Sequence, residues 1–147
     1  MPSSAPLRLA INGYGRIGRC FLRALLESPS AGHLEIVAIN EPANLESMAY
    51  LTRYDSTHGR LRGEVEISGS ALAINGRGIE VSHARTPEAV DWRALDIDLL
   101  IESSGGYGQR AELTRFLDAG CPRLLLSHPG FSGDDVDATI VNGINQH

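Results

Sequence analysis

The chain has 147 residues, of which 42% are hydrophobic and 21% are charged, and this composition is typical of a folded domain rather than of a disordered chain. Its 13 basic and 18 acidic residues give a formal net charge of −5 at pH 7, which argues against a nucleic-acid partner because nucleic-acid-binding surfaces are basic. No apolar run near the N-terminus is long enough for a signal peptide or a membrane helix, so we expect a cytoplasmic protein without a membrane partner.

The first half of the chain predicts an unstructured leader, followed by strands that alternate with helices. Short apolar runs predict the strands, whereas apolar residues at helical spacing predict the helices. The second strand is nearly all apolar, as in strands that helices cover on both faces. Asn44 is expected to cap the second helix, and the first helix is expected to bury an apolar stripe of Ile17, Cys20, Phe21, Ala24 and Leu25. The predicted elements are the leader at residues 1–6, strands at 7–12 and 34–40, and helices at 16–28 and 44–54.

The second half of the chain first changes its periodicity and then returns to alternating strands and helices. Residues 61–83 alternate apolar and polar side chains around Asn75-Gly76, and this pattern predicts an antiparallel hairpin. Gly120 is expected to end the last helix in a left-handed conformation. The predicted elements that follow the hairpin are helices at 86–95 and 107–119 and strands at 97–102, 123–127 and 138–143. Together these elements predict one α/β domain over residues 7–147, with a doubly wound, Rossmann-type, mostly parallel sheet and an inserted hairpin.

The sharpest motif is the sequence GYGRIG at residues 13–18, which fits G-x-G-x-x-G between the first strand and the first helix. In this pattern Gly13 permits the tight turn, Gly15 lets a pyrophosphate approach the backbone, and Gly18 lets the helix pack closely on the sheet. Free amides at the start of the helix then point at the anion. The motif alone leaves open a glycine-rich turn that binds nothing.

Glu41 strengthens the prediction of a dinucleotide site. It follows the second strand and lies 41 − 18 = 23 residues after Gly18, where an acidic residue is expected to bind the adenosine ribose. Pro42 favours an extended backbone at Glu41 and so keeps it at the end of the strand. Because a carboxylate here repels the 2′-phosphate of NADP, NAD is the expected cofactor. The alternative is an ordinary solvated loop acid.

Polar turns follow two further predicted strands, ESSGG at residues 102–106 and SHPG at residues 127–130. Ligands of open α/β sheets bind at the carboxyl ends of strands, so these turns are expected at the far edge of the same site, although plain polar turns are the alternative. Cys20 and Cys121 form neither a disulfide framework nor a zinc spacing, no metal site is expected, and both thiols are predicted to be structural.

Four segments resemble the glyceraldehyde-3-phosphate dehydrogenase superfamily: INGYGRIGR at 11–19, YDSTHGR at 54–60, ESSG at 102–105 and VNGIN at 141–145. Within it, Glu41 stands where the glycolytic enzyme usually has Asp, and SHPG at 127–130 replaces its usual Ser-Ala-Pro-Ser. These features and residues 137–141 resemble the D-erythrose-4-phosphate dehydrogenase branch. Ser104 and Gly106 depart from a usual Thr and Val of the family.

The resemblance implies an oxidoreductase, the NAD-binding half of an NAD-dependent aldehyde dehydrogenase, whose intact form is a homotetramer. The substrate implied by the branch is erythrose 4-phosphate, oxidised to 4-phosphoerythronate for pyridoxal phosphate (pyridoxine) biosynthesis. A phosphorylating glyceraldehyde-3-phosphate dehydrogenase is one alternative, and a stand-alone nucleotide-binding module without catalysis is another. The family's nucleophilic cysteine lies beyond the last matching residues, so no catalytic residue is expected in this chain and the catalytic domain is expected to be absent from it. The residues implied to bind NAD are Gly13, Gly15, Arg16, Ile17, Gly18, Glu41, Arg85, Ser104, Gly105 and Ser127.

Overall fold

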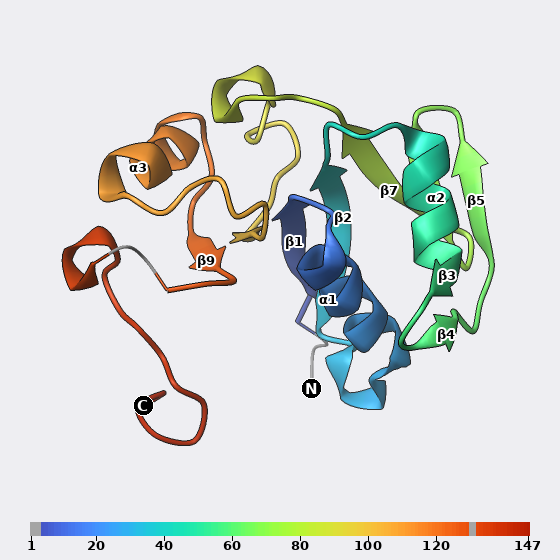
Figure 1. Ribbon diagram of the computed structural model, residues 1–147, viewed down its shortest axis with the longest axis horizontal. Helices are drawn as coiled ribbons and strands as arrows, with labels where there is room; N and C mark the ends of the chain where they lie inside the picture. The colour runs from blue at the N-terminus through green and yellow to red at the C-terminus, as the bar shows by residue number, and fades with distance from the viewer. Residues whose placement is uncertain (1–3, 130–131) are drawn as a thin grey trace.

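The computed structural model describes residues 4–129 and 132–147 (Figure 1). A seven-stranded sheet has the order β5-β6-β7-β2-β1-β8-β9, in which the strands from β7 to β9 pair in parallel and those from β5 to β7 pair antiparallel. The main strands are β1 (Leu7–Asn12), β2 (Leu34–Asn40), β5 (Val65–Ser68), β6 (Ala71–Ile74), β7 (Arg77–Ser82), β8 (Leu99–Glu102) and β9 (Leu124–Leu126). The helices are α1 (Arg16–Glu27), α2 (Leu45–Arg53) and α3 (Arg110–Asp118), and β3 (Tyr54–Asp55) with β4 (Gly59–Arg60) forms a small second sheet.

The sheet has helices on both faces, which confirms the predicted doubly wound architecture. Successive side chains of a strand point to opposite faces. In β1, Leu9 and Ile11 belong to the core under α1 and α2, which lie in front of the sheet in Figure 1. Ala10 belongs to the core on the other face, where the small side chains of Ala10 and Ala38 lie in one cluster with the large rings of Trp92 and Phe116.

Local signals in the sequence explain several element ends. Asn44 caps α2 as predicted, since its Oδ1 accepts a hydrogen bond of 2.8 Å from the amide of Ser47. Gly120 follows α3 with a φ of +118°, a conformation that favours glycine. Asn75 and Gly76 both have positive φ, as the tight turn between β6 and β7 requires. The predicted hairpin is therefore confirmed, and β7 also pairs in parallel with β2, so the hairpin widens the main sheet.

The predicted helix at residues 86–95 is wrong. Only Pro87–Ala89 form a single 3₁₀ turn, and a series of turns follows. The side chain of Asp91 accepts from the amide of Ala94, and the indole of Trp92 donates to the carbonyl of Pro87 at 2.8 Å. These local bonds compete with a helical ladder, and they let Trp92 enter the core.

The predicted strand at residues 138–143 is also wrong. The segment pairs with no strand in the described part of the chain, and its side chains are exposed. Asn145 instead folds the segment back on itself, because its side chain accepts from the amide of Val141 and donates to the carbonyl of Thr139. A strand without a neighbour has no partner for its backbone groups, so local loop bonds replace the ladder.

The predicted apolar stripe of α1 is only partly correct. Phe21 and Leu25 pack against the core as expected, but the side chain of Ile17 is 53% exposed and Ala24 is also exposed. Leu22 and Gly18 form the buried face instead. The helix is therefore rotated so that Ile17, in its first turn, faces outward.

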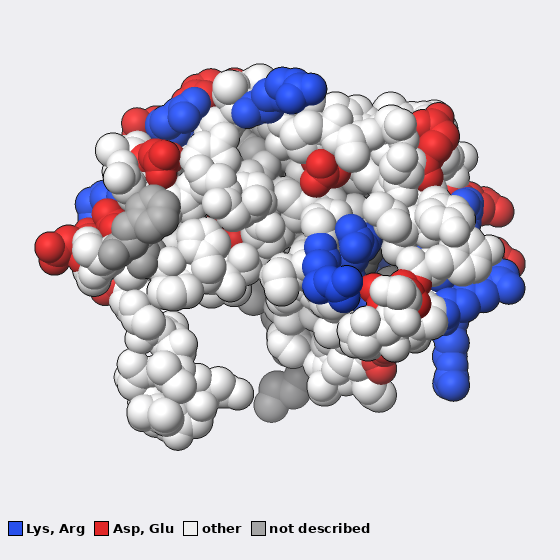
Figure 2. Space-filling view, viewed as in Figure 1, with Lys and Arg blue, Asp and Glu red and all other residues white. Residues whose placement is uncertain are grey.

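The face shown in Figure 2 carries small, separate groups of acidic and of basic side chains, and no continuous basic region. No helix among residues 4–129 and 132–147 has the length and apolar character needed to cross a membrane.

The packing of α3 gives a test of the fold. Phe116 is 0% exposed, and its ring centroid lies 4.8 Å from that of Tyr107 and 6.3 Å from that of Trp92. We expect Phe116→Ala to lower the free energy of unfolding by about 3–5 kcal/mol in urea denaturation. The control is Leu117→Ala in the same helix, which is 45% exposed and is expected to cost less than about 1 kcal/mol. Equal losses in the two variants would contradict this placement of α3.

Candidate cofactor-binding site

A row of polar side chains closes four adjacent parallel strands at their carboxyl ends. We call Ser82, Asn40, Asn12 and Glu102, the last residues of β7, β2, β1 and β8, the strand-end row. Ser82 Oγ donates to Asn40 Oδ1 at 2.8 Å, Asn40 Nδ2 donates to Asn12 Oδ1 at 2.8 Å, and Asn12 Nδ2 donates to Glu102 Oε1 at 3.0 Å. Asn12, Asn40 and Glu102 are buried and Ser82 is half-buried, so these bonds replace water as partners and fix each side chain in one orientation.

The loops that leave these strands are tied to their neighbours by backbone bonds. The amide of Gly13 donates to the carbonyl of Asn40, and the amide of Ser103 donates to the carbonyl of Asn12, at 2.9 and 2.8 Å. Glu41 is held in the same way by Ser82, at 2.9 Å. The ladder thus extends one residue beyond the strands, and the three loops begin side by side.

The glycine loop has the geometry that its motif predicts. Gly13 has a φ of +90°, and an added Cβ would lie 2.4 Å from the backbone of Ser104, so the turn excludes other residues. A Cβ at Gly18 would lie 2.4 Å from the carbonyl oxygen of Gly13, which is the predicted close approach. At Gly15 a Cβ would meet nothing within 4 Å. Open space therefore lies above the backbone of Gly15 alone among these three glycines.

The N-terminus of α1 faces that open space. The first amide of the helix to bond is that of Arg19, which donates to the carbonyl of Gly15 at 3.0 Å. The amides of Arg16 and Ile17 therefore precede the hydrogen-bond ladder of the helix. Amides in this position, with the positive end of the helix dipole, favour an anion such as a pyrophosphate.

Tyr14 anchors the glycine loop from below. Its buried hydroxyl lies 2.7 Å from Thr52 Oγ1, which itself donates to the carbonyl of Met48, so Tyr14 is the donor to Thr52. Burial raises the pKa of Tyr14 to about 12, and the ring stays neutral. The loop is thus attached to α2 as well as to the sheet.

Glu41 reaches back to the same loop. Its Oε2 accepts from the amide of Tyr14 at 2.7 Å, and its Oε1 accepts from the amide of Ala43 at 3.1 Å. Each carboxylate oxygen has two lone pairs, so both oxygens retain capacity to accept from the hydroxyls of a ribose. The carboxylate is thereby fixed beside the glycine loop and not free in solvent.

These groups line a cleft of about 340 Å³, which lies within the range of small-molecule sites. Five of the predicted residues meet there: Gly13, Gly15, Glu41, Arg85 and Ser104. Gly18 packs beneath the loop and Arg16 and Ile17 begin α1, and these three residues do not line the cleft. Gly105, with a φ of +74°, and Ser127, whose amide donates to the carbonyl of Glu102, lie outside the lining of the cleft. The other lining residues are Asn12, Asn40, Pro42, Ala84, Thr86, Ser103 and Tyr107.

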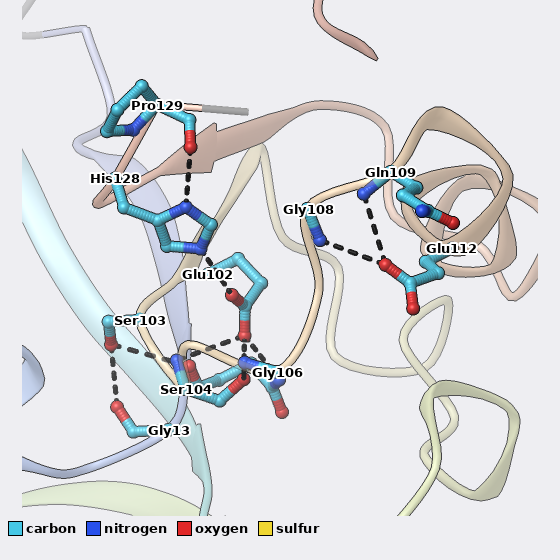
Figure 3. Close-up of polar contacts among 11 residues, drawn as sticks. Gly13, Glu102, Ser103, Ser104, Gly106, Gly108, Gln109, Glu112, His128 and Pro129 are labelled. Atoms are coloured by element: carbon cyan, nitrogen blue, oxygen red, sulfur yellow. Dashed lines mark hydrogen bonds and ion pairs between the residues drawn. The ribbon is translucent and has the colours of Figure 1, made fainter. Parts of the chain in front are cut away.

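The wall formed by the segment after β8 depends on Glu102 (Figure 3). Glu102 Oε1 accepts from the amide of Ser104 at 3.1 Å and from the hydroxyl of Ser104. Ser104 Oγ in turn accepts from the amide of Gly106 at 3.2 Å. Ser103 Oγ donates to the carbonyl of Gly13 at 2.6 Å, so this segment also holds the glycine loop.

The residues implied to bind NAD did not include Asn12, Asn40 or Glu102, although these three orient the loops that form the site, and only Glu102 belonged to a turn that was expected at its edge. A signal was present, because each is the polar last residue of a mostly apolar strand. In a parallel sheet such residues meet at one edge. The strand register was needed to show that all three are directly adjacent.

The two thiols are poor candidates for catalysis. Burial raises the pKa of Cys121 to about 12, so it carries no thiolate near neutral pH. Cys20 lies half-buried on α1, in a narrow crevice against α2 and away from the cleft. No group of three His, Cys, Asp or Glu side chains suited to a metal ion occurs among residues 4–129 and 132–147.

A mostly parallel, doubly wound sheet with this glycine loop defines a dinucleotide-binding α/β domain. Residues 7–110 match the family described as glyceraldehyde 3-phosphate dehydrogenase, NAD binding domain, and the chain belongs to this family. The domain binds NAD and is part of an NAD-dependent oxidoreductase family. The matched range includes every residue that lines the cleft.

Gly15 provides a direct test of the cleft. Its backbone is in an ordinary extended conformation with open space around the Cβ position, so Gly15→Val is expected to leave the fold intact. Because the branched side chain fills the space where a pyrophosphate approaches the backbone, we expect NAD binding to fall below detection in calorimetric titration, with an unchanged circular dichroism spectrum.

The matched control is Gly78→Val in β7, where a Cβ also meets nothing within 4 Å. This variant is expected to bind NAD as the unchanged chain does. If Gly15→Val also retained full affinity, the glycine loop would be only a turn.

Proposed function

We propose that this chain is the NAD-binding half of a sugar-phosphate aldehyde dehydrogenase that oxidises D-erythrose 4-phosphate to 4-phosphoerythronate. The observation that carries the cofactor part of this proposal is the open space above Gly15, with Glu41 fixed beside it. One site thus offers free amides for a pyrophosphate and a carboxylate for a ribose.

The proposed cofactor contacts follow from these positions. The amides of Arg16 and Ile17 bind the pyrophosphate, Glu41 accepts from the ribose hydroxyls, and exposed Arg85 lies at the adenine end. Ser104 forms the opposite wall, and we extend the site along the neighbouring strand ends to Gly105 and Ser127. Bound NAD supplies a hydride acceptor for aldehyde oxidation, whereas this chain's residues bind and orient it.

The proposed substrate rests on the resemblance to the erythrose-4-phosphate branch. Glu41 and His128 are two of its features, and both lie at the strand ends, where Glu41 accepts a hydrogen bond from the glycine loop and His128 lies 4.0 Å from Glu102. Gly130, which ends the same SHPG sequence, lies outside the described residues. The description of the matched family favours the second candidate, a phosphorylating glyceraldehyde-3-phosphate dehydrogenase. If the coding sequence continues past His147 into a cysteine-containing segment, comparing kcat/KM for the two aldehydes on the protein that it encodes decides between them.

We expect the 147-residue chain to bind NAD without oxidising either aldehyde. Cys121 is buried and protonated, and Cys20 lies outside the cleft, so neither provides a thiolate next to the bound cofactor. The measurement is NADH absorbance after mixing the pure chain with NAD and each aldehyde. NADH formed above a protein-free blank would show that a nucleophile lies within these residues.

Glu41 sets the expected choice of cofactor. Glu41→Gln keeps an oxygen that accepts from the amide of Tyr14 but loses the charge, and hydrogen bonds to charged groups contribute about 1.5–3 kcal/mol. We therefore expect NAD to bind roughly tenfold to a hundredfold more weakly, at about 1.4 kcal/mol per decade. NADP is expected to lose less affinity or to gain some, because its 2′-phosphate is no longer repelled and Arg85 lines the same cleft.

Calorimetric titration of both cofactors into the unchanged chain and the variant measures the NAD/NADP preference. Glu66→Gln is the control, since Glu66 is an exposed carboxylate on β5 that does not line the cleft. An unchanged NAD/NADP ratio in Glu41→Gln would mean that Glu41 does not contact the ribose.

A further inference from the structure

Besides Glu41, the cleft has a second carboxylate close to it, that of the buried Glu102. Glu102 is 0% exposed, and its Oε2 lies 4.0 Å from Nε2 of His128. His128 lies just after β9, the strand that pairs with β8. The distance from Oε2 to Nε2 is too long for a hydrogen bond, and neither buried atom has another partner among the described residues. The two residues are held beside each other by the backbone, because the amide of Ser127 donates to the carbonyl of Glu102 at 3.0 Å.

Hydrogen-bond roles show that this pair needs a proton. His128 Nδ1 lies 2.8 Å from the carbonyl oxygen of Pro129, which only accepts, so Nδ1 carries a hydrogen. A neutral imidazole then presents the lone pair of Nε2 to Glu102. Because Oε1 of Glu102 already accepts from Asn12 and Ser104, the free lone pairs of the carboxylate are on Oε2. Without an added proton, two acceptors face each other in a buried place.

The surroundings of Glu102 hold no other cation that pairs with it in the described residues. On the β1 side its neighbour is the uncharged Asn12, and on the segment after β8 its neighbour is the uncharged Ser104. The titratable group on that segment is Tyr107, whose pKa is raised by burial and, to a smaller extent, by Glu102. A protonated His128 would therefore place a positive charge beside this buried carboxylate.

We propose that His128 is a positioning residue of the cofactor cleft, whose imidazolium compensates Glu102 and so holds Ser104 and Asn12 in place for NAD. The proposal rests on the proposed function, in which NAD occupies this cleft. The connection is short: Glu102 Oε1 binds Ser104, and the backbone of Ser104 lies against Gly13. His128 contacts Glu102 from the side opposite to the cleft wall that Ser104 forms (Figure 3).

The NAD affinity is expected to depend on pH, because the compensating charge requires a proton on His128. The compensating charge exists while the imidazole is protonated and is lost as pH rises. NAD affinity is therefore expected to be lower at pH 8 than at pH 6. His128→Ala removes this dependence and weakens NAD roughly tenfold at the lower pH, because a buried acceptor then has no partner.

A double-mutant cycle on NAD affinity tests whether His128 acts through Glu102. The variants are His128→Ala, Glu102→Gln and both together, titrated with NAD at pH 6 and pH 8. The amide of Gln needs no compensating charge. Whatever the NAD affinity of Glu102→Gln, adding His128→Ala to this variant is expected to lower that affinity by less than about twofold. An equal loss in both backgrounds, or no loss in His128→Ala alone, would overturn the proposal.

The matched control is His33→Ala, an exposed histidine at the opposite end of the sheet, just before β2. It is expected to keep the affinity and the pH dependence of the unchanged chain. If Glu102→Gln does not fold, the pH profiles of the unchanged chain, His128→Ala and His33→Ala decide the matter. A profile that persists in His128→Ala, or that is absent from the unchanged chain, would overturn the proposal.

Failure of the proposed function gives a different result. If the unchanged chain does not bind NAD, every titration is blank. The thermal unfolding midpoint without cofactor then tests the pair itself. We expect His128→Ala to lower this midpoint more at pH 6 than at pH 8, and an equal or smaller decrease at pH 6 would show that the imidazolium does not compensate Glu102.

Discussion

Buried polar side chains at the ends of parallel strands must find their hydrogen-bond partners in one another, and this requirement fixes the cofactor edge of the domain. Asn12 links Asn40 on one side to Glu102 on the other. The loops that carry Gly13, Glu41 and Ser104 leave from these same strand ends. A shift of one strand would therefore leave buried amide or carboxylate groups without partners and would displace the cleft at the same time.

The cleft divides its chemistry between backbone and side chains. Around Gly15 the backbone amides face open space, and this geometry suits an anion whatever the neighbouring side chains are. In our proposal, selectivity comes from side chains at the rim of the cleft, where Glu41 supplies a negative charge and Arg85 a positive one. Because Glu41 also accepts from the amide of Tyr14, the group that recognises the ribose in our proposal stabilises the glycine loop as well.

The differences between the sequence-based predictions and the structure have a common origin. The helix predicted at residues 86–95 was based on apolar spacing, but Trp92 and Val90 enter the core through turns stabilised by local side-chain bonds. The strand predicted at residues 138–143 finds no neighbouring strand in the described part of the chain. In α1, the predicted stripe placed Ile17 inside, whereas the turn at Gly15 and the contact at Gly18 rotate it outward. In each case periodicity reports neither the local side-chain bonds nor the strand neighbours and glycine contacts that decide the outcome.

The sequence by itself determined the strand–helix order of the first half, the hairpin at Asn75-Gly76, the caps at Asn44 and Gly120, and the dinucleotide motif with its acidic partner. These features are local, because backbone conformation, capping and glycine tolerance depend on residues a few positions apart. Only the tertiary structure decided that Asn12, Asn40 and Glu102 form one row, that Glu41 holds the glycine loop, and that His128 lies beside a buried carboxylate. These contacts join residues 27 to 90 positions apart or lie across strand pairs, and the register of the sheet, which is set by the packing of the whole core, is what brings them together.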